Sequence, residues 1–246
     1  MNKIIIANRK GGVAKSTTAV HLAAGLAMVG VRVLLIDTDT QGHCAYMLGV
    51  EPEKGLADVL DGSEGTGALY EARENLFLLA GGRNLAGISR LIARENIAPE
   101  KFMSKKLKQF DGQFDVAIID GAPGFNELAI NALVYATEAI IPVSYEILSV
   151  HGLSEFLQEI EEIEEAANFS LPYRILPTIK DNRVKKTEQI GQQLTDYFNG
   201  KVLEPIPYSA EVSRAPGQKK TLFEYAPKDR ACHSYAILAG TVGRGL

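Results

Sequence analysis

The sequence is poor in cysteine and has no long apolar run. Only Cys44 and Cys232 occur among its 246 residues, far apart and without C-x-x-C spacing, which argues against a disulfide framework or a zinc cluster and suits a reducing cytosol. No apolar stretch approaches the ~20 residues that a membrane-spanning helix needs, and the chain does not start with a basic segment followed by an apolar leader. We therefore expect a soluble, cytoplasmic protein that does not bind membrane.

Repeats, low-complexity tracts and Pro/Ser-rich linkers are also missing, so we expect residues 1–246 to form a single domain. The net charge of −4 gives no sign of a nucleic-acid binder. The charge is unevenly distributed, however: residues 174–230 carry eleven basic and seven acidic side chains, a balance of +4 that leaves −8 for the rest. Such a local excess is compatible with contacts to a phosphate backbone. An ordinary solvated surface is the alternative.

Short apolar runs alternate with helical patterns along the chain. This order predicts an α/β fold with a doubly wound, mostly parallel sheet and helices on both faces. Ligands of such sheets bind at the carboxyl ends of the strands, so Asp37, Asp39 and Asp120, which lie at strand ends, should converge there. The expected strands cover residues 3–7, 32–37, 76–80, 115–120, 139–143 and 174–178, with a shorter one near 202–203.

A glycine-containing turn, Arg-Lys-Gly-Gly-Val-Ala-Lys-Ser-Thr at residues 9–17, follows the first expected strand and precedes a helical pattern. A turn with little side-chain bulk lets backbone N–H groups point at phosphate oxygens, and the helix N-terminus adds partial positive charge. Lys15 would reach the β- and γ-phosphates, and Ser16 would ligate Mg²⁺. The turn therefore predicts a nucleotide site of the P-loop NTPase type, although Arg9 and Ala14 stand where G-x-x-x-x-G-K-[ST] has glycine.

The narrower pattern K-G-G-x-x-K-[ST] is intact and adds Lys10 five residues before Lys15. Residues 4–49 follow the landmarks N-x-K-G-G-V-G-K-[ST]-T, L-L-x-D-x-D-P-Q-G and L-G. The chain thus resembles the ParA/MinD group of deviant Walker A ATPases, and ParA-type partition ATPases in particular, over nearly its whole length. Ala14 departs from the family's glycine and Thr40 from its proline. If position 14 needs positive φ, alanine strains the loop and weakens nucleotide binding.

The resemblance implies a role for each polar residue of the site. Ser16, Asp37 and Asp120 would hold Mg²⁺, directly or through its hydration shell, and Asp39 would orient and activate the attacking water. Lys10 would reach across a two-fold interface to the ATP of a second copy, so that ATP binding closes a homodimer. The alternatives are a hydrogen-bonding strand end for Asp120, a capping turn for Asp37 and Asp39, and a solvent-exposed lysine for Lys10. The residues with catalytic roles would be Lys10, Lys15 and Asp39.

Two further sets of residues follow from the same resemblance. Residues 206–216 are similar to the family's I-P-x-x-x-x-[VL]-x-x-A-P segment, which borders the adenine. The implied nucleotide-binding residues are Lys10, Gly11, Gly12, Val13, Ala14, Lys15, Ser16, Thr17, Pro207 and Tyr208. The cations that would contact DNA phosphates are Lys180, Arg183, Lys185, Lys186, Arg214, Lys219 and Lys220.

These features lead to one function hypothesis and one alternative. The hypothesis is a partition or positioning ATPase with ATP and Mg²⁺ as cofactors: ATP drives dimerisation and non-specific binding to nucleoid DNA, and a ParB-like or other cargo adaptor stimulates a weak basal hydrolysis that resets it. The alternative is a related ATPase that delivers or assembles a metal or cofactor without DNA; the lack of cysteine and histidine clusters disfavours it. Residues 155–165 carry six glutamates on a helical pattern, which indicates a solvated face or a contact surface for a basic partner.

Overall fold

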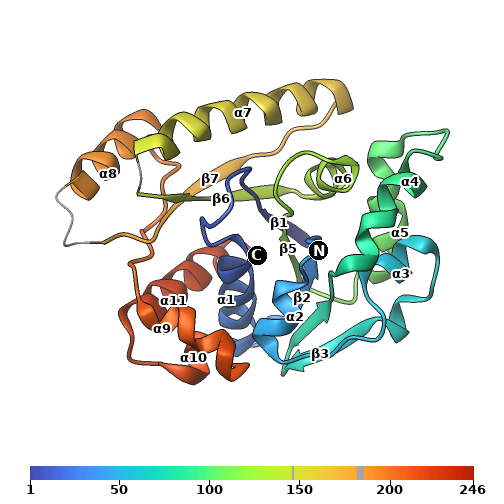
Figure 1. Cartoon of the computed structure of the whole chain (residues 1–246), viewed down its shortest axis with the longest axis horizontal. Coiled ribbons are helices and arrows are strands. Elements are labelled where there is room, and N and C mark those ends of the chain that lie inside the picture. Colours follow the sequence, from blue (N-terminus) through green and yellow to red (C-terminus); the bar gives the residue numbers. More distant parts are fainter. Residues whose placement is uncertain (146, 182–185) are drawn as a thin grey trace.

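A seven-stranded sheet forms the centre of the molecule in the computed structural model, which describes residues 1–145, 147–181 and 186–246 (Figure 1). The strand order is β3-β4-β2-β5-β1-β6-β7, and all neighbours are parallel except β3 and β4. The strands are β1 (Asn2–Ile6), β2 (Val33–Asp37), β3 (Leu69–Arg73), β4 (Leu76–Leu79), β5 (Val116–Asp120), β6 (Glu138–Ser144) and β7 (Tyr173–Thr178).

Helices connect the strands and continue to the C-terminus. The α-helices are α1 (Lys15–Met28), α2 (His43–Leu48), α3 (Leu56–Asp61), α4 (Ile88–Ile92), α5 (Phe102–Leu107), α6 (Glu127–Tyr135), α7 (Ile147–Ala167), α8 (Lys186–Tyr197), α9 (Ala210–Arg214), α10 (Leu222–Tyr225) and α11 (Arg230–Gly243). Short 3-10 turns are η1 (Gly65–Gly67), η2 (Arg83–Gly87), η3 (Pro99–Lys101), η4 (Lys108–Phe110) and η5 (Ala215–Gln218). Within the part of the chain that the structure describes, no helix is both long and apolar enough to cross a membrane.

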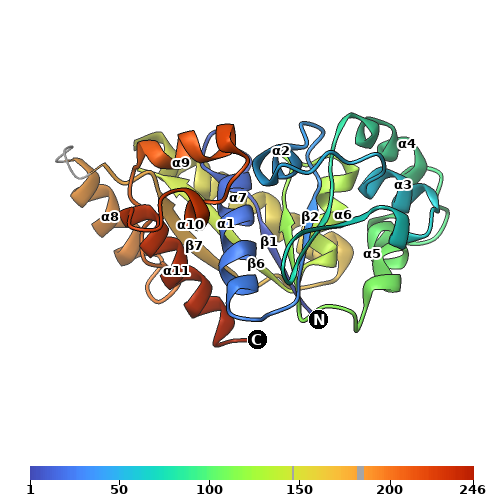
Figure 2. The same cartoon turned by 90° about the horizontal axis from the view of Figure 1, so that it is seen from below.

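Helices cover both faces of the sheet, as the alternation in the sequence predicted. Ile4 and Ile6 of β1 pack into a core shared with α1, α2, α10 and α11, whereas Ile5 packs into a second core shared with α3 to α8. Successive strand residues point to opposite faces, so a parallel strand buried on both sides is apolar throughout. Figures 1 and 2 show α1 and α11 on one side of the sheet and α7 on the other. The doubly wound fold class is confirmed.

Two details of the sheet differ from the sequence-based prediction. The sheet has an edge strand, β3, that was not predicted; it runs antiparallel to β4, and none of its residues is fully buried. The short strand expected at residues 202–203 is wrong, because only a single bridge joins Val202 to Ile175. The glutamate-rich stretch 155–165 lies within α7, as its helical pattern predicted.

Candidate nucleotide site

The turn between β1 and α1 is anchored from below by Asn8. Its buried side chain donates from Nδ2 to the carbonyl of Pro142 on β6 (2.7 Å), and its Oδ1 accepts the backbone N–H of Lys10 (2.9 Å). Asn8 therefore ties the start of the turn to the neighbouring strand. Sequence reasoning gave Asn8 no role, although its place in N-x-K-G-G was the available signal.

Ala14 occupies the left-handed region, with φ 69° and ψ 35°, immediately before α1. The condition set by the sequence is met: position 14 needs positive φ, and alanine pays a steric cost of about 1–2 kcal/mol there. Gly12 also has positive φ, 75°, and a side chain at Gly11 or Gly12 would meet nothing within 4 Å. The glycines thus leave a bare backbone surface with room for a phosphate group.

Lys15 begins α1 with its side chain buried. Its Nζ donates to the carbonyl of Lys10 (2.9 Å), which folds the turn back over the ammonium group. Burial lowers the pKa of Lys15, while the negative charges of Asp120 and Asp39 oppose that change. The structure therefore brings Lys15 within electrostatic reach of two of the predicted carboxylates, on the side of the turn where an anion would sit.

Asp37 and Asp120 end adjacent strands, β2 and β5, in direct register, and both side chains are fully buried. Burial, and then the charge of Asp37, raises the pKa of Asp120, whose carboxylate also accepts the Ser16 hydroxyl. Burial raises the pKa of Asp37 as well. Asp120 Oδ1 has no hydrogen-bond partner among the described residues. Two buried carboxylates and an unpartnered oxygen beside a hydroxyl fit a hydrated Mg²⁺, which prefers oxygen ligands.

Cys44 is a member of this cluster that sequence reasoning did not identify. Its backbone N–H donates to Asp37 Oδ2 (3.1 Å), and its thiol donates to Asp120 Oδ2 (3.4 Å). One ligand atom from each of the three residues lies within 4.8 Å of the others. Burial raises the pKa of the thiol, and the two carboxylates raise it further. Cys44 is therefore a neutral donor that orients the carboxylates, and its sequence position alone did not indicate this.

Asp39 lies beyond the end of β2, half-buried, in a tight turn. Its Oδ1 accepts the N–H of Gln41 (3.0 Å), while its own N–H donates to Asp37 Oδ1 (2.9 Å). The capping turn considered for this pair is thus present, and β2 ends at Asp37 rather than carrying both aspartates on one strand. A side chain at Gly81 would lie 2.5 Å from the carbonyl of Asp39, so only glycine lets the loop after β4 pack against this turn.

A cavity of about 270 Å³ extends from the turn to the segment after β7. Its wall includes Gly12, Ala14 and Thr17 on one side and Pro207 and Tyr208 on the other. Backbone hydrogen bonds between Lys180 and residues 206 and 208 hold the second wall in place. Residues almost two hundred positions apart in the sequence therefore face one cavity, as expected if Pro207 and Tyr208 border the base.

The two cations before the glycines differ in their contacts. Arg9 makes an ion pair with Glu159 of α7 (2.8 Å), which links the turn to the glutamate-rich helix. Lys10 is exposed at the outer surface of the turn, and its backbone carbonyl receives Lys15. This exposure agrees with the alternative of a solvent-exposed lysine. It also places Lys10 on a surface that a second copy can reach.

The predicted DNA-contacting cations do not form one described cluster. Arg214, Lys219 and Lys220 are exposed around η5, whereas Lys180 is partly buried beside the segment that carries Pro207. Arg214 pairs with Glu211 (2.7 Å) and Lys219 with Glu51 (3.4 Å). Arg183 and Lys185 lie outside the described residues, and the side chain of Lys186, at the start of α8, is not described.

Comparisons with known proteins agree with this geometry. A family model described as an AAA domain matches residues 1–173. The chain is 33% identical over 244 residues to the chromosome-partitioning ATPase Soj of Thermus thermophilus, covering 98% of this chain and 95% of that protein. It is 34% identical over 250 residues to the sporulation initiation inhibitor protein Soj of Bacillus subtilis, covering 98% of each. The structure of cobyrinic acid a,c-diamide synthase from Mycobacterium smegmatis with bound ATP analog and magnesium superimposes with a TM-score of 0.85 at 31% identity, covering 99% of this chain and 95% of that one.

Proposed function

The chain belongs to the AAA-domain family and, within it, to the ParA/MinD-type partition ATPases, and from this membership we propose that it is an ATP-dependent partition or positioning ATPase. The observation that carries the proposal is the placement of Lys15, Asp37 and Asp120 at one end of the sheet, below a bare glycine turn. The near full-length similarity to two Soj proteins favours partition over other uses of the same site.

ATP and Mg²⁺ are the cofactors that fit the site. The cavity beside Thr17 has room for a base, the turn offers backbone N–H groups to phosphates, and the buried Asp120 Oδ1 has no hydrogen-bond partner among the described residues. When bound, Mg²⁺ would offset the negative charge of the phosphates. Ser16, Asp37 and Asp120 would hold the ion, the last two through its water ligands.

Residues of the chain itself would bind the phosphates, orient the attacking water and contact the base. Lys15 would leave the carbonyl of Lys10 and donate to the β- and γ-phosphates, an exchange that replaces a neutral acceptor by a charged one. Asp39 is half-buried and would accept a hydrogen bond from the attacking water, which aligns that water with the γ-phosphate. Pro207 and Tyr208 would pack against the base.

Lys10 would complete the site of a second copy. Lys15 would serve the phosphates of its own chain, and Lys10, exposed at the opposite end of the turn, would reach phosphates across a two-fold axis. A lysine in an interface gains charge-assisted hydrogen bonds when it meets phosphate and is costly to bury when it does not. Dimerisation would therefore depend on the γ-phosphate, and hydrolysis would release the pair.

The ATP-bound dimer would bind DNA without sequence preference through its basic C-terminal surface, and a ParB-like or other cargo adaptor would stimulate hydrolysis. The decisive experiment is a mobility-shift titration of random duplex DNA with protein in Mg²⁺, with ATP and without nucleotide. We expect a shift that requires ATP and weakens steeply with salt. Equal binding with and without ATP would reject the DNA part of this proposal.

A second candidate function is ATP-dependent metal or cofactor chemistry without DNA, and the likeness to cobyrinic acid a,c-diamide synthase favours considering it. Against a metal cargo, the described residues form only one group of potential metal ligands, Asp37, Cys44 and Asp120, and it lies inside the nucleotide site. ATP turnover that is unaffected by DNA and by adaptor, but accelerated by a small-molecule acceptor, would support this second function.

A further inference from the structure

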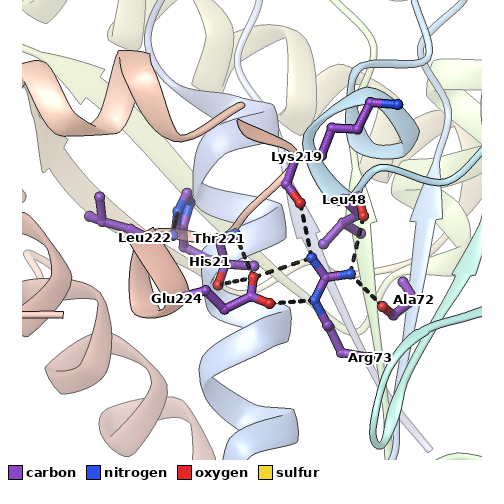
Figure 3. A network of polar contacts seen from close by, with 8 residues as sticks. All are labelled: His21, Leu48, Ala72, Arg73, Lys219, Thr221, Leu222 and Glu224. Carbon is purple, nitrogen blue, oxygen red and sulfur yellow. Dashed lines mark hydrogen bonds and ion pairs between the residues drawn. The ribbon is translucent and has the colours of Figure 1, made fainter. Parts of the chain in front are cut away.

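Arg73, at the end of β3, holds together parts of the chain that are far apart in sequence (Figure 3). Its guanidinium donates to both carboxylate oxygens of Glu224, at 2.7 and 3.2 Å. It also donates to the carbonyls of Leu48 and Lys219, both at 3.1 Å, and to that of Ala72. A planar fork can make such a set of bonds at once, whereas a lysine ammonium cannot.

The segment that Arg73 grips is residues 214–220, which we call the basic turn because it presents Arg214, Lys219 and Lys220 to solvent. In this turn only Ala215 is fully buried, so little apolar packing fixes it. Lys219 is in the left-handed region, with φ 54°, and its side chain extends away from Arg73 while its carbonyl points toward it (Figure 3). The position of the turn therefore depends on hydrogen bonds to neighbouring elements.

A first route connects the basic turn to the start of α1, next to the glycine-containing turn. Leu222, two residues after the basic turn, donates its N–H to His21 Nε2 (2.9 Å). Since that nitrogen is an acceptor, His21 Nδ1 carries the proton and donates to the carbonyl of Thr17 (2.7 Å). Thr17 lies in the first turn of α1 and lines the nucleotide cavity. Thr221 adjoins Leu222, and its N–H and hydroxyl both donate to Glu224.

A second route connects the basic turn to the aspartate cluster. Cys44, at the start of α2, donates its N–H to Asp37. Leu48, at the end of α2, accepts a hydrogen bond from Arg73 through its carbonyl. The next residue, Gly49, lies so close to Lys219 that a Cβ on it would be 2.8 Å from Lys219 Cβ. The six residues of α2 thus form a short rod between Asp37 and the basic turn.

Both routes meet at the ion pair of Arg73 and Glu224, so the basic turn is joined to both ends of the nucleotide site. We propose that Arg73 is a positioning residue that couples nucleotide occupancy to the basic turn, and thereby to the binding of a polyanion such as DNA by Lys219 and Lys220. This inference rests on the proposed function, since it assigns a control to its DNA surface. Movement of Thr17 or Asp37 on binding Mg²⁺-nucleotide would reach the turn through His21 or α2.

The first test compares DNA affinity with and without a non-hydrolysable ATP analogue in wild-type, Arg73→Gln and Arg73→Lys proteins. Arg90→Gln is the matched control, because it removes one exposed charge on α4 and leaves the network intact. We expect the nucleotide-dependent gain in affinity to fall about fivefold or more in both Arg73 variants, with unchanged nucleotide affinity and an unchanged gain in the control. Full coupling in Arg73→Lys or in Arg73→Gln would overturn the proposal.

The second test needs no DNA and so separates this inference from the proposed function. Amide hydrogen exchange of residues 215–222 is measured with and without the Mg²⁺-bound analogue in the wild type and in Glu224→Gln, a variant that keeps the arginine and can be used if Arg73 variants do not fold. Slower exchange on nucleotide binding in the wild type, lost in the variant, supports the coupling. If nucleotide does not change the exchange rates in the wild type, the proposed coupling is overturned, even if DNA binding proves to be ATP-dependent.

Discussion

Ala14 is a strained residue in the candidate nucleotide site. It has a left-handed conformation at the start of α1, where glycine would bear no steric cost. We expect Ala14→Gly to relieve strain of about 1 kcal/mol, partly cancelled by the greater freedom of glycine in the unfolded chain. The variant should therefore keep its stability or gain slightly, and bind ADP and ATP analogues several-fold more tightly in calorimetry.

Ala86→Gly is the matched control for Ala14→Gly. It removes an exposed methyl group in η2, where φ is negative, and should cost about 0.5–1 kcal/mol through chain entropy alone. A loss of stability in Ala14→Gly as large as that in Ala86→Gly would mean that the left-handed backbone at position 14 carries no strain.

Asp39 can be tested separately from the buried carboxylates because it is half-buried and takes part in no strand pairing. We expect Asp39→Ala to bind nucleotide normally, to lose at least about two orders of magnitude in ATP turnover, and to accumulate dimers in sedimentation with ATP. Asp61→Ala, an exposed carboxylate at the end of α3, should behave as the wild type. Normal turnover by Asp39→Ala would remove Asp39 from the water-activating role.

At the residue scale, the sequence predicted the contacts that follow from the sheet backbone. Asp37 and Asp120 had to meet because parallel strands end at one edge, and they do meet, in register. Cys44 escaped notice because its contact with Asp120 spans 76 positions and depends on how α2 turns after the strand. Arg73 escaped for the same reason: a bond between positions 73 and 224 leaves no local pattern.

At the element scale, α1 is tied to its neighbours through one buried histidine. His21 stacks on Tyr235 of α11 with ring centroids 4.8 Å apart and accepts the N–H of Leu222 at the start of α10. Burial lowers the pKa of His21 to about 4, and the hydrogen bond with Thr17 offsets part of that change. His21 is therefore neutral in the folded protein at any pH above that value.

This histidine predicts a pH dependence of stability. As the pH falls through about 6.5, this histidine becomes protonated in the unfolded chain but stays neutral in the folded protein. The free energy of unfolding therefore decreases until the pH reaches about 4, by about 3 kcal/mol in all. In urea titrations from pH 7 to 4.5, His21→Gln should be less stable at pH 7 but lose less stability on acidification. The exposed His233→Gln should follow the wild type; an unchanged slope in His21→Gln would contradict the prediction.

Elements buried on both faces were predictable from sequence, and elements at the rim were not. Residues 4–6 of β1 and the first four residues of β2 and of β5 are all apolar because helices cover both sides. The edge strand β3 is half-exposed and contains glutamate and arginine, so it lacks such a run. Val202 makes one bridge to Ile175, and the chain then continues beside β7 with only scattered backbone hydrogen bonds, such as that from Ile206 to Pro177, so no continuous strand forms.

At the scale of the whole molecule, the net charge has the same sign as the charge of DNA, the proposed partner. The protein carries −4 overall, and the region that would meet DNA carries a local excess of cations. One copy offers few described candidates for phosphate contact, namely Lys180, Arg214, Lys219 and Lys220, and two of these already face acidic partners. A single copy should therefore bind DNA weakly, and pairing two copies through nucleotide would double the contacts on one duplex.

This doubling can be measured as a salt dependence. Each phosphate contact contributes about −0.9 to the slope of log K against log salt concentration, so up to four contacts give about −4 for one copy and about −7 for two. We expect the steeper slope for wild-type protein with an ATP analogue. Lys10→Ala, which keeps Lys15 and nucleotide but should remain a single copy in sedimentation, should give the shallower slope. The same slope for both proteins, with only the wild type paired, would mean that the basic turns of the two copies do not engage one duplex together.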